Sequence, residues 1–193
     1  HAIMTEIDVD EATPGKNSEG AELLSLEPVV TPKELQILRK WYSGADFVVE
    51  FGAGGSTVLA GALGVPRVAS VDSSKAWLEK LRTAPELQNT DFTAHHVNIG
   101  KLKAWGHPAD FSRAWNWPSY YRVIWDQIDN RRPDVVFVDG RFRVACALMT
   151  LLECPAETTV IIHDFWNRPS YGEILKYVDT IERDDDIGVF RRK

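Results

Sequence analysis

The sequence predicts an α/β fold in which parallel strands alternate with helices around one central sheet. The first observation is a short apolar run at 47–49, which leads into a glycine-rich turn and then into a helix-forming segment. The second is that β-branched runs at 134–138 and 158–162 each end close to an acidic residue. The third is a pair of strand-like segments around 184–186, which indicates a closing β-hairpin.

Length and composition indicate one globular domain. The 193 residues can bury a sizeable core, and the hydrophobic share of 44% is ordinary for such a domain. With 22 basic and 28 acidic side chains the formal net charge is −6, which argues against a broad nucleic-acid-binding surface. No apolar run approaches the roughly 20 residues needed to cross a bilayer. The two cysteines have neither metal-site nor redox spacing, so we expect a cytoplasmic protein.

The chain begins with an acidic segment that lacks periodicity. We therefore expect a loose N-terminal arm at 1–27 and a single folded domain at 28–193. The motif Thr-Pro-Lys-Glu at 31–34 is a capping box with proline at the first helical position, which predicts the start of a helix. Leu35 and Leu38 follow at helical spacing, so this helix is expected to pack on the sheet.

The glycine turn after the first strand is the main candidate for a cofactor site. Gly52, Gly54 and Gly55 allow a sharp turn that a ligand can approach closely. A dinucleotide would place its pyrophosphate over G-x-G-x-x-G, but Thr57 stands at the third glycine and Glu50 would repel the phosphates. S-adenosylmethionine (SAM) has a cationic sulfonium and ammonium, which Glu50 would attract. The third alternative is a turn that binds no ligand.

The next predicted strand, at 67–71, also ends at an acid. Asp72 lies about 20 residues after Gly52, the distance at which a βαβ unit returns a carboxylate to the ribose of a nucleotide. A carboxylate that accepts ribose hydroxyls gains about 1.5–3 kcal/mol for each hydrogen bond. Asp72 could instead cap the following helix, but Ser73 and Ser74 are available for that role. We therefore expect Asp72 to bind the ribose.

A third strand is predicted at 92–99, and a tryptophan-rich segment at 105–125 follows it. This segment departs from the simple alternation of strands and helices. Three of its tryptophans lie in turn-like sequence, where they could line a substrate pocket or stack on adenine: Trp105, Trp115 and Trp117.

Charged side chains follow the fourth and fifth predicted strands. Because ligands bind beyond the carboxyl ends of parallel strands, Asp139, His163 and Asp164 are expected to share one site. In one interpretation His163 is a general base that Asp139 or Asp164 orients. In a second, the two aspartates hold Mg²⁺, which lowers the pKa of an acceptor hydroxyl. In a third, His163 and Asp164 only support the loop.

The strand-end motifs resemble those of class I SAM-dependent methyltransferases. They are Glu-Phe-Gly-Ala-Gly-Gly-Ser at 50–56, Val-Asp at 71–72, Val-Asp-Gly-Arg at 138–141 and His-Asp at 163–164. Bacterial methyltransferase-like proteins with the last two motifs are the most similar group. The resemblance implies a Rossmann-like, doubly wound, seven-stranded sheet of order 3-2-1-4-5-7-6 with an antiparallel C-terminal hairpin. It also implies that SAM is the cofactor and contacts Glu50, Gly52, Gly54, Ser56, Asp72, Ser73 and Asn98.

The predicted function is methyl transfer from SAM to an oxygen atom of a small-molecule or sugar-like acceptor. Asp139, His163 and Asp164 are the predicted catalytic residues, and Mg²⁺ is the less favoured alternative to a reaction without metal. A SAM-binding module without turnover and a dinucleotide-dependent oxidoreductase are the competing functions. We expect no nucleic-acid or membrane partner, and the sequence leaves the oligomeric state open, a homo-oligomer included.

Overall fold

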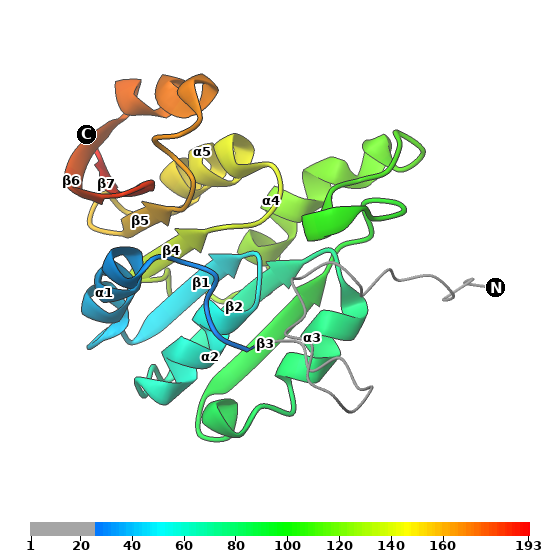
Figure 1. Cartoon of the computed structure of the whole chain (residues 1–193), viewed down its shortest axis with the longest axis horizontal. Helices are drawn as coiled ribbons and strands as arrows, with labels where there is room; N and C mark the ends of the chain where they lie inside the picture. Colours follow the sequence, from blue (N-terminus) through cyan, green and yellow to red (C-terminus); the bar gives the residue numbers. More distant parts are fainter. Residues whose placement is uncertain (1–25) are drawn as a thin grey trace.

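The computed structural model describes residues 26–193, and the predicted arm at 1–27 lies almost entirely outside them. Seven strands form one sheet of order β3-β2-β1-β4-β5-β7-β6 (Figure 1). The strands are β1 (Phe47–Phe51), β2 (Arg67–Asp72), β3 (Asp91–His96), β4 (Val135–Val138), β5 (Thr159–Ile162), β6 (Val178–Asp184) and β7 (Ile187–Arg192). This topology confirms the predicted fold class and strand order.

All neighbouring strands are parallel except β7, which runs antiparallel to both β5 and β6. The central strands are apolar along their whole length because helices cover both faces, and all five residues of β1 are buried. Phe47, Val49 and Phe51 face one side of the sheet, and Val48 faces the other. The predicted closing hairpin is β6–β7.

Helices cover both faces of the sheet (Figure 1). On one face α4 and α5 pack against the sheet, and on the other face lie α1, α2 and α3. The helices are α1 (Pro32–Tyr42), α2 (Gly55–Ala62), α3 (Lys75–Leu81), α4 (Trp117–Gln127) and α5 (Arg143–Glu153). Short 3₁₀ helices lie at Pro85–Leu87, Ala104–Gly106, Ala114–Asn116 and Pro169–Lys176. No helix in the described part of the chain is both long and apolar enough to span a bilayer.

The first helix begins at the predicted capping box. The Thr31 hydroxyl accepts a hydrogen bond from the Glu34 backbone amide at 3.2 Å, and the Glu34 carboxylate accepts one from the Thr31 amide at 2.9 Å. Unlike most capping-box glutamates at a helix surface, Glu34 is only 2% exposed. It therefore faces the interior at the edge of the sheet where the strands end.

The register of the parallel strands brings four strand ends to one edge of the sheet. Phe51 pairs with both Val71 and Val138, and Val138 pairs with Ile162. The residues that follow β1, β2, β4 and β5 therefore meet beside one another. This is the edge at which ligands bind in open α/β sheets.

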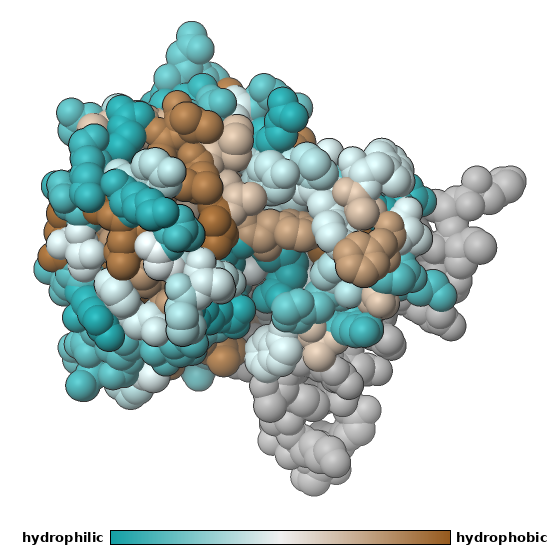
Figure 2. Space-filling view, turned by 90° about the horizontal axis from the view of Figure 1, so that it is seen from above, coloured by the Kyte–Doolittle hydropathy of each residue, from teal (hydrophilic) through white to brown (hydrophobic). Residues whose placement is uncertain are grey.

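The tryptophan-rich segment leaves several large aromatic side chains on the surface. Trp105, Phe111 and Trp115 are all more than half exposed, whereas Trp125 is buried in the core. Figure 2 shows the molecule from above, with hydrophobic side chains lying among hydrophilic ones on that face. The segment thus contributes both to the core and to the surface.

Candidate active site

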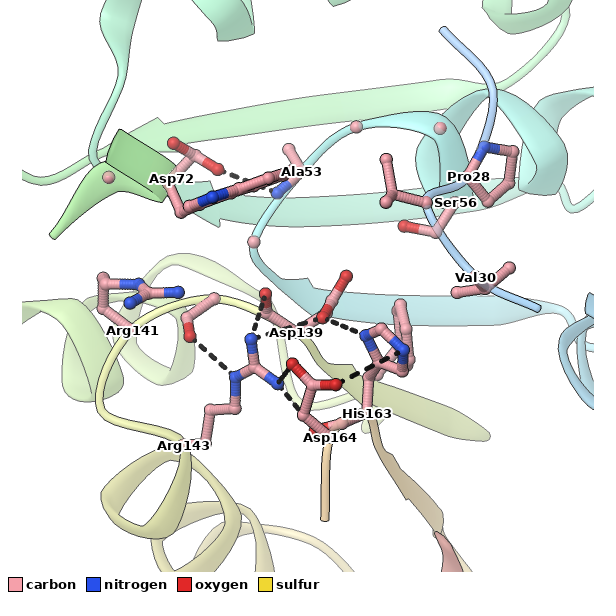
Figure 3. A pocket seen from close by; sticks show the side chains of 18 of the residues that line it. Pro28, Val30, Ala53, Ser56, Asp72, Asp139, Arg141, Arg143, His163 and Asp164 are labelled. Carbon is pink, nitrogen blue, oxygen red and sulfur yellow. Dashed lines mark hydrogen bonds and ion pairs between the residues drawn. The ribbon is translucent and has the colours of Figure 1, made fainter. Parts of the chain in front are cut away.

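A cavity of about 810 Å³ opens at the carboxyl edge of the sheet (Figure 3). The glycine turn, the ends of β2, β4 and β5, the segment after β3 and the chain just before α1 all contribute to its wall. Most of the predicted site residues line it: Gly52, Gly54, Ser56, Asp72, Ser73, Asp139, His163 and Asp164. Glu50 and Asn98 do not.

The glycine turn packs tightly against the turn that follows β4. Gly52 has a φ of +94°, and a Cβ at this position would lie 2.7 Å from the backbone nitrogen of Gly140. A Cβ on Gly140 would in turn lie 2.1 Å from the Tyr120 hydroxyl. Two glycines therefore let the turns approach backbone to backbone. The floor of the cavity is consequently formed by main chain.

Glu50 lies behind this turn and not in the cavity. Its side chain is fully buried and accepts hydrogen bonds from the hydroxyls of Thr57, Tyr42 at 2.8 Å and Ser70 at 2.9 Å. Burial raises the pKa of Glu50, while these hydrogen bonds oppose that shift. The Thr57 hydroxyl also accepts from the Gly54 amide at 3.0 Å. Glu50 thus supports the turn from the core, and its direct contact with the cofactor stays a prediction.

Asp72 lines the cavity and also fixes the surrounding backbone. Its Oδ2 accepts from the Ala53 amide at 2.9 Å, and its Oδ1 accepts from the Ser74 amide at 2.8 Å. Burial raises the pKa of Asp72, and these backbone hydrogen bonds counteract the shift. As expected, Ser74 caps α3, by accepting from the Trp77 amide at 3.3 Å. Since a carboxylate can accept about four hydrogen bonds, Asp72 retains capacity for a ligand.

Asn98 is exposed at the end of β3 and does not reach the cavity. Its side-chain oxygen accepts from the Gly100 amide at 3.0 Å, and its carbonyl accepts from the Asn116 side chain at 2.8 Å. Local hydrogen bonds therefore hold Asn98 in the loop outside the cavity, and its contact with adenine stays a prediction.

A small hairpin at 101–109 forms the cavity wall instead. It is closed by hydrogen bonds from the Lys103 amide to the His107 carbonyl at 2.6 Å and from the Ala109 amide to the Lys101 carbonyl at 2.7 Å. Trp105 lies at its tip with a φ of +60° and lines the cavity. Of the three tryptophans expected at a pocket, the structure places only this one in the cavity wall.

His163 lies between two carboxylates. Its Nδ1 lies 2.8 Å from Asp139 Oδ1, and its Nε2 lies 3.2 Å from Glu34 Oε2 (Figure 3). Burial alone would lower the pKa of His163, but the hydrogen bond and charge of Asp139, with the charges of Asp164 and Glu34, raise it to about 9. Both ring nitrogens of the cationic form donate to carboxylates. With both ring nitrogens of His163 engaged in this way, the geometry favours a positioning role, and the general-base role stays a prediction.

Asp164 is paired with two arginines. Arg143 Nη1 lies 3.3 Å from Asp164 Oδ2, and Arg168 Nη2 lies 3.1 Å from the same oxygen. Burial would raise the pKa of Asp164, but the charges of His163, Arg143 and Arg168 outweigh it and lower the pKa. Arg143, with a side chain 5% exposed, also donates to the carbonyl of His163 at 2.6 Å. These ion pairs connect the loops after β4 and β5.

The ion pairs of Asp139 and Asp164 argue against the alternative in which these two carboxylates hold Mg²⁺. Asp139 and Asp164 already have cationic partners, since Asp139 Oδ1 lies 2.8 Å from His163 and 3.5 Å from Arg143. Within residues 26–193, no group of three or more His, Cys, Asp or Glu side chains is arranged to hold a metal ion. The residues present at the two strand ends thus do not fit a magnesium site.

Glu34 is the site residue that the sequence interpretation missed. Its Oε1 accepts from the Asp186 amide at 3.2 Å, and its Oε2 lies near His163 and the Thr31 amide. The sequence marks Glu34 only as a capping residue, and nothing local predicts that its carboxylate is buried against β5. It joins α1, the loop after β5 and the β6–β7 turn.

Comparison with known proteins identifies the family. No protein-family model and no curated protein matches the chain. Among solved structures, a methyltransferase-like protein from Silicibacter pomeroyi is 31% identical, with a TM-score of 0.79 over 88% of this chain and 90% of that one. This chain belongs to the class I SAM-dependent methyltransferases.

More distant methyltransferases share the fold alone. TehB from Haemophilus influenzae is 12% identical, with a TM-score of 0.57, and the match covers 86% of this chain and 64% of TehB. The 16S rRNA methyltransferase RsmC from Thermus thermophilus, solved with AdoMet and guanosine, is 15% identical with a TM-score of 0.51. That match covers 85% of this chain and 43% of RsmC.

The cavity of this methyltransferase fits SAM. Gly52 and Gly54 line its floor, and their Cβ directions point to the Gly140 backbone and the Trp77 indole, so main chain and indole close the floor together. Asp72 offers a carboxylate at the end of β2, and the indole of Trp77, held by a 2.6 Å hydrogen bond to the Ala53 carbonyl, adds an aromatic wall. These groups suit a ribose, an aromatic base and a short zwitterionic chain.

Proposed function

We propose that this protein transfers a methyl group from SAM to an oxygen atom of a small acceptor. The supporting observation is that a single cavity joins the glycine turn and Asp72 to the ion-paired cluster at the ends of β4 and β5. Its volume of about 810 Å³ lies within the range of about 300–1,000 Å³ that is typical of small-molecule sites.

One half of the cavity would hold the cofactor. Asp72 would accept the ribose hydroxyls, and Ser73 and Ser56 add hydroxyl groups on either side. The backbone of 52–54 would support the methionine part. When bound, SAM supplies a methyl carbon made electrophilic by its sulfonium, and the protein has to exclude water and align the acceptor with that carbon.

The other half would hold the acceptor. Asp139 lies between the two halves, and its side chain is 32% exposed. In this proposal Asp139 aligns the acceptor with the methyl group of SAM. His163 and Asp164 act through it: His163 holds Asp139 by the 2.8 Å hydrogen bond, and Asp164 fixes Arg143, which also pairs with Asp139. His163 and Asp164 are thus positioning residues in this proposal.

A methyl-transfer assay tests this function. Purified protein would be incubated with methyl-labelled SAM and a set of alcohols, phenols, sugars and carboxylic acids, and the label in each product would be measured. We expect transfer to an oxygen of at least one compound, reduced strongly by Asp139→Asn. Because this substitution also removes the main ionic partner of His163, activity would be compared well below the melting temperature of the variant.

Two outcomes would favour the competing functions. Binding of S-adenosylhomocysteine (SAH) without any transfer would indicate a SAM-binding module that does not turn over. Binding of NAD that SAH fails to displace would indicate an oxidoreductase instead.

A further inference from the structure

Arg141 differs from the other arginines that line the cavity. Arg143 and Arg168 both pair with the carboxylate of Asp164. Among residues 26–193, Arg141 has no carboxylate oxygen within the 4.0 Å of an ion pair, although its side chain is half-buried and lines the cavity. Asp72 is near enough for the charge of Arg141 to act on it, but no carboxylate pairs with the guanidinium directly. Because a half-buried guanidinium without a direct ion pair is costly, this position suits an anion supplied by a ligand.

The surroundings of Arg141 strengthen this point. Its Nη1 contacts Nε2 of His107. Burial, and to a lesser extent the charge of Arg141, lower the pKa of His107. His107 is therefore neutral and accepts the hydrogen bond from Arg141. Burial and the neighbouring charges of Arg143 and Arg168 lower the pKa of Arg141. Figure 3 shows Arg141 on the opposite side of Asp139 from His163, with Asp72 above it. An anion bound here would relieve the repulsion between like charges.

The groups of the acceptor half that could act as a base already have partners, and His107, the neutral histidine in the cavity wall, accepts from Arg141. His163 is cationic and donates from both nitrogens, and Asp164 is held by two guanidinium groups. Asp139 Oδ1 is shared between His163 and Arg143. A hydroxyl acceptor would have to lose its proton to one of these groups. A carboxylic acid, with a pKa of about 4, has already lost it at neutral pH.

We propose that the acceptor is a small carboxylic acid, that Arg141 binds its carboxylate, and that the product is a methyl ester. This inference rests on the methyl transfer proposed above. One carboxylate oxygen attacks the methyl carbon of SAM, and the new C–O bond forms as the C–S bond breaks. The electron pair of the C–S bond goes to sulfur, so the sulfonium becomes a neutral thioether. No proton is transferred, and the charges of acceptor and cofactor cancel.

The product chemistry gives the first test. Each carboxylic acid in the assay is matched with the alcohol of the same carbon skeleton, for example benzoate with benzyl alcohol. Mild alkali releases volatile labelled methanol from a methyl ester but not from a methyl ether. We expect label in the acids only, in alkali-labile form.

Each outcome of this test has a separate meaning. Alkali-stable label in the alcohols would overturn the inference and leave the proposed methyl transfer intact. If SAH binds but no acid or alcohol is methylated, both the carboxylate inference and the proposed methyl transfer are overturned. If SAH does not bind, the assignment of SAM as the cofactor is overturned as well.

A substitution of Arg141 gives the second test. Arg141→Met is expected to raise the KM for the acid ten-fold or more, because the carboxylate loses its charged partner, and to leave SAH affinity within two-fold. Arg141→Lys should recover part of the loss, since it restores the charge without the bidentate geometry. Arg122→Met removes the same charge from an exposed position outside the cavity and should behave as wild type. An equal loss of SAH affinity in Arg141→Met would place Arg141 in the cofactor site and overturn the inference.

The pH profile gives the third test. Because the proposed step transfers no proton, kcat/KM for the acid should be flat from about pH 6 to pH 8 and fall only as the acceptor carboxyl group becomes protonated near pH 4. A rise of kcat/KM across pH 6–8 would show that a base removes a proton, which would contradict a carboxylate acceptor.

Discussion

The ion-paired His163 makes the stability of this protein depend on pH in a defined window. Its pKa is about 9 in the folded protein, against an ordinary value of 6.5, a difference of about 2.5 pH units. At about 1.4 kcal/mol per pH unit, the protonated imidazole contributes about 3 kcal/mol to the free energy of unfolding. Because the folded pKa is the higher one, this contribution is complete below pH 6.5 and is lost as the pH rises through 9.

Urea denaturation followed by tryptophan fluorescence would measure this contribution. We expect the difference in unfolding free energy between wild type and His163→Gln to shrink by about 2 kcal/mol from pH 6 to pH 8.5. His107→Gln is the matched control, because His107 is exposed and its pKa is lowered, so it does not titrate in this window. A difference between wild type and His163→Gln that stays constant with pH would refute the assignment of a charged His163.

Three further substitutions test the cavity and its support. Asp72→Ala should weaken SAH binding ten-fold or more in calorimetry, because the ribose loses a charged acceptor; unchanged affinity would remove Asp72 from the site. Gly140→Ala should lower the free energy of unfolding by about 1–3 kcal/mol, since its Cβ would lie 2.1 Å from the Tyr120 hydroxyl. Adding Tyr120→Phe should recover part of that loss, and strictly additive losses would contradict the clash. Glu50→Gln should cost about 1–3 kcal/mol in urea denaturation, because an amide cannot accept from three buried hydroxyls; wild-type stability would show that the carboxylate is dispensable.

The strand ends of the site were predictable because they depend on local sequence and on one topological rule. A buried apolar run such as 134–138 marks a parallel strand, and parallel strands bring their carboxyl ends to one edge. That reasoning places Asp72, Asp139 and His163 in the same cavity, as the structure has them. The fold and strand order followed from the resemblance carried by the same motifs.

The surroundings of Glu50, Asn98 and His163 depend on packing that the sequence does not encode locally. Glu50 stands at a strand end in sequence, but its side chain points to the core, where Tyr42 and Ser70 from other elements bind it. Asn98 is held outside by a turn of its own. The state of His163 depends on Glu34, which is 129 positions away in the chain. Such contacts emerge only when α1 is placed against the end of β5.

The placement of Arg141 also depends on packing that the sequence does not encode locally. Arg141 and Arg143 stand two positions apart in the sequence. In the structure Arg143 turns into the cluster with Asp164, whereas Arg141 lies along the cavity against His107. Only the three-dimensional arrangement separates an arginine that holds the loops from one that lies along the cavity wall.

Calorimetric titration with SAH, with NAD titrated in parallel, is the most direct test of the central claim that the cavity holds SAM. We predict micromolar binding of SAH with one molecule per chain and no heat of binding with NAD. Binding of NAD, or no binding of either compound to the folded protein, would contradict the assignment of the glycine turn and Asp72 to a SAM site.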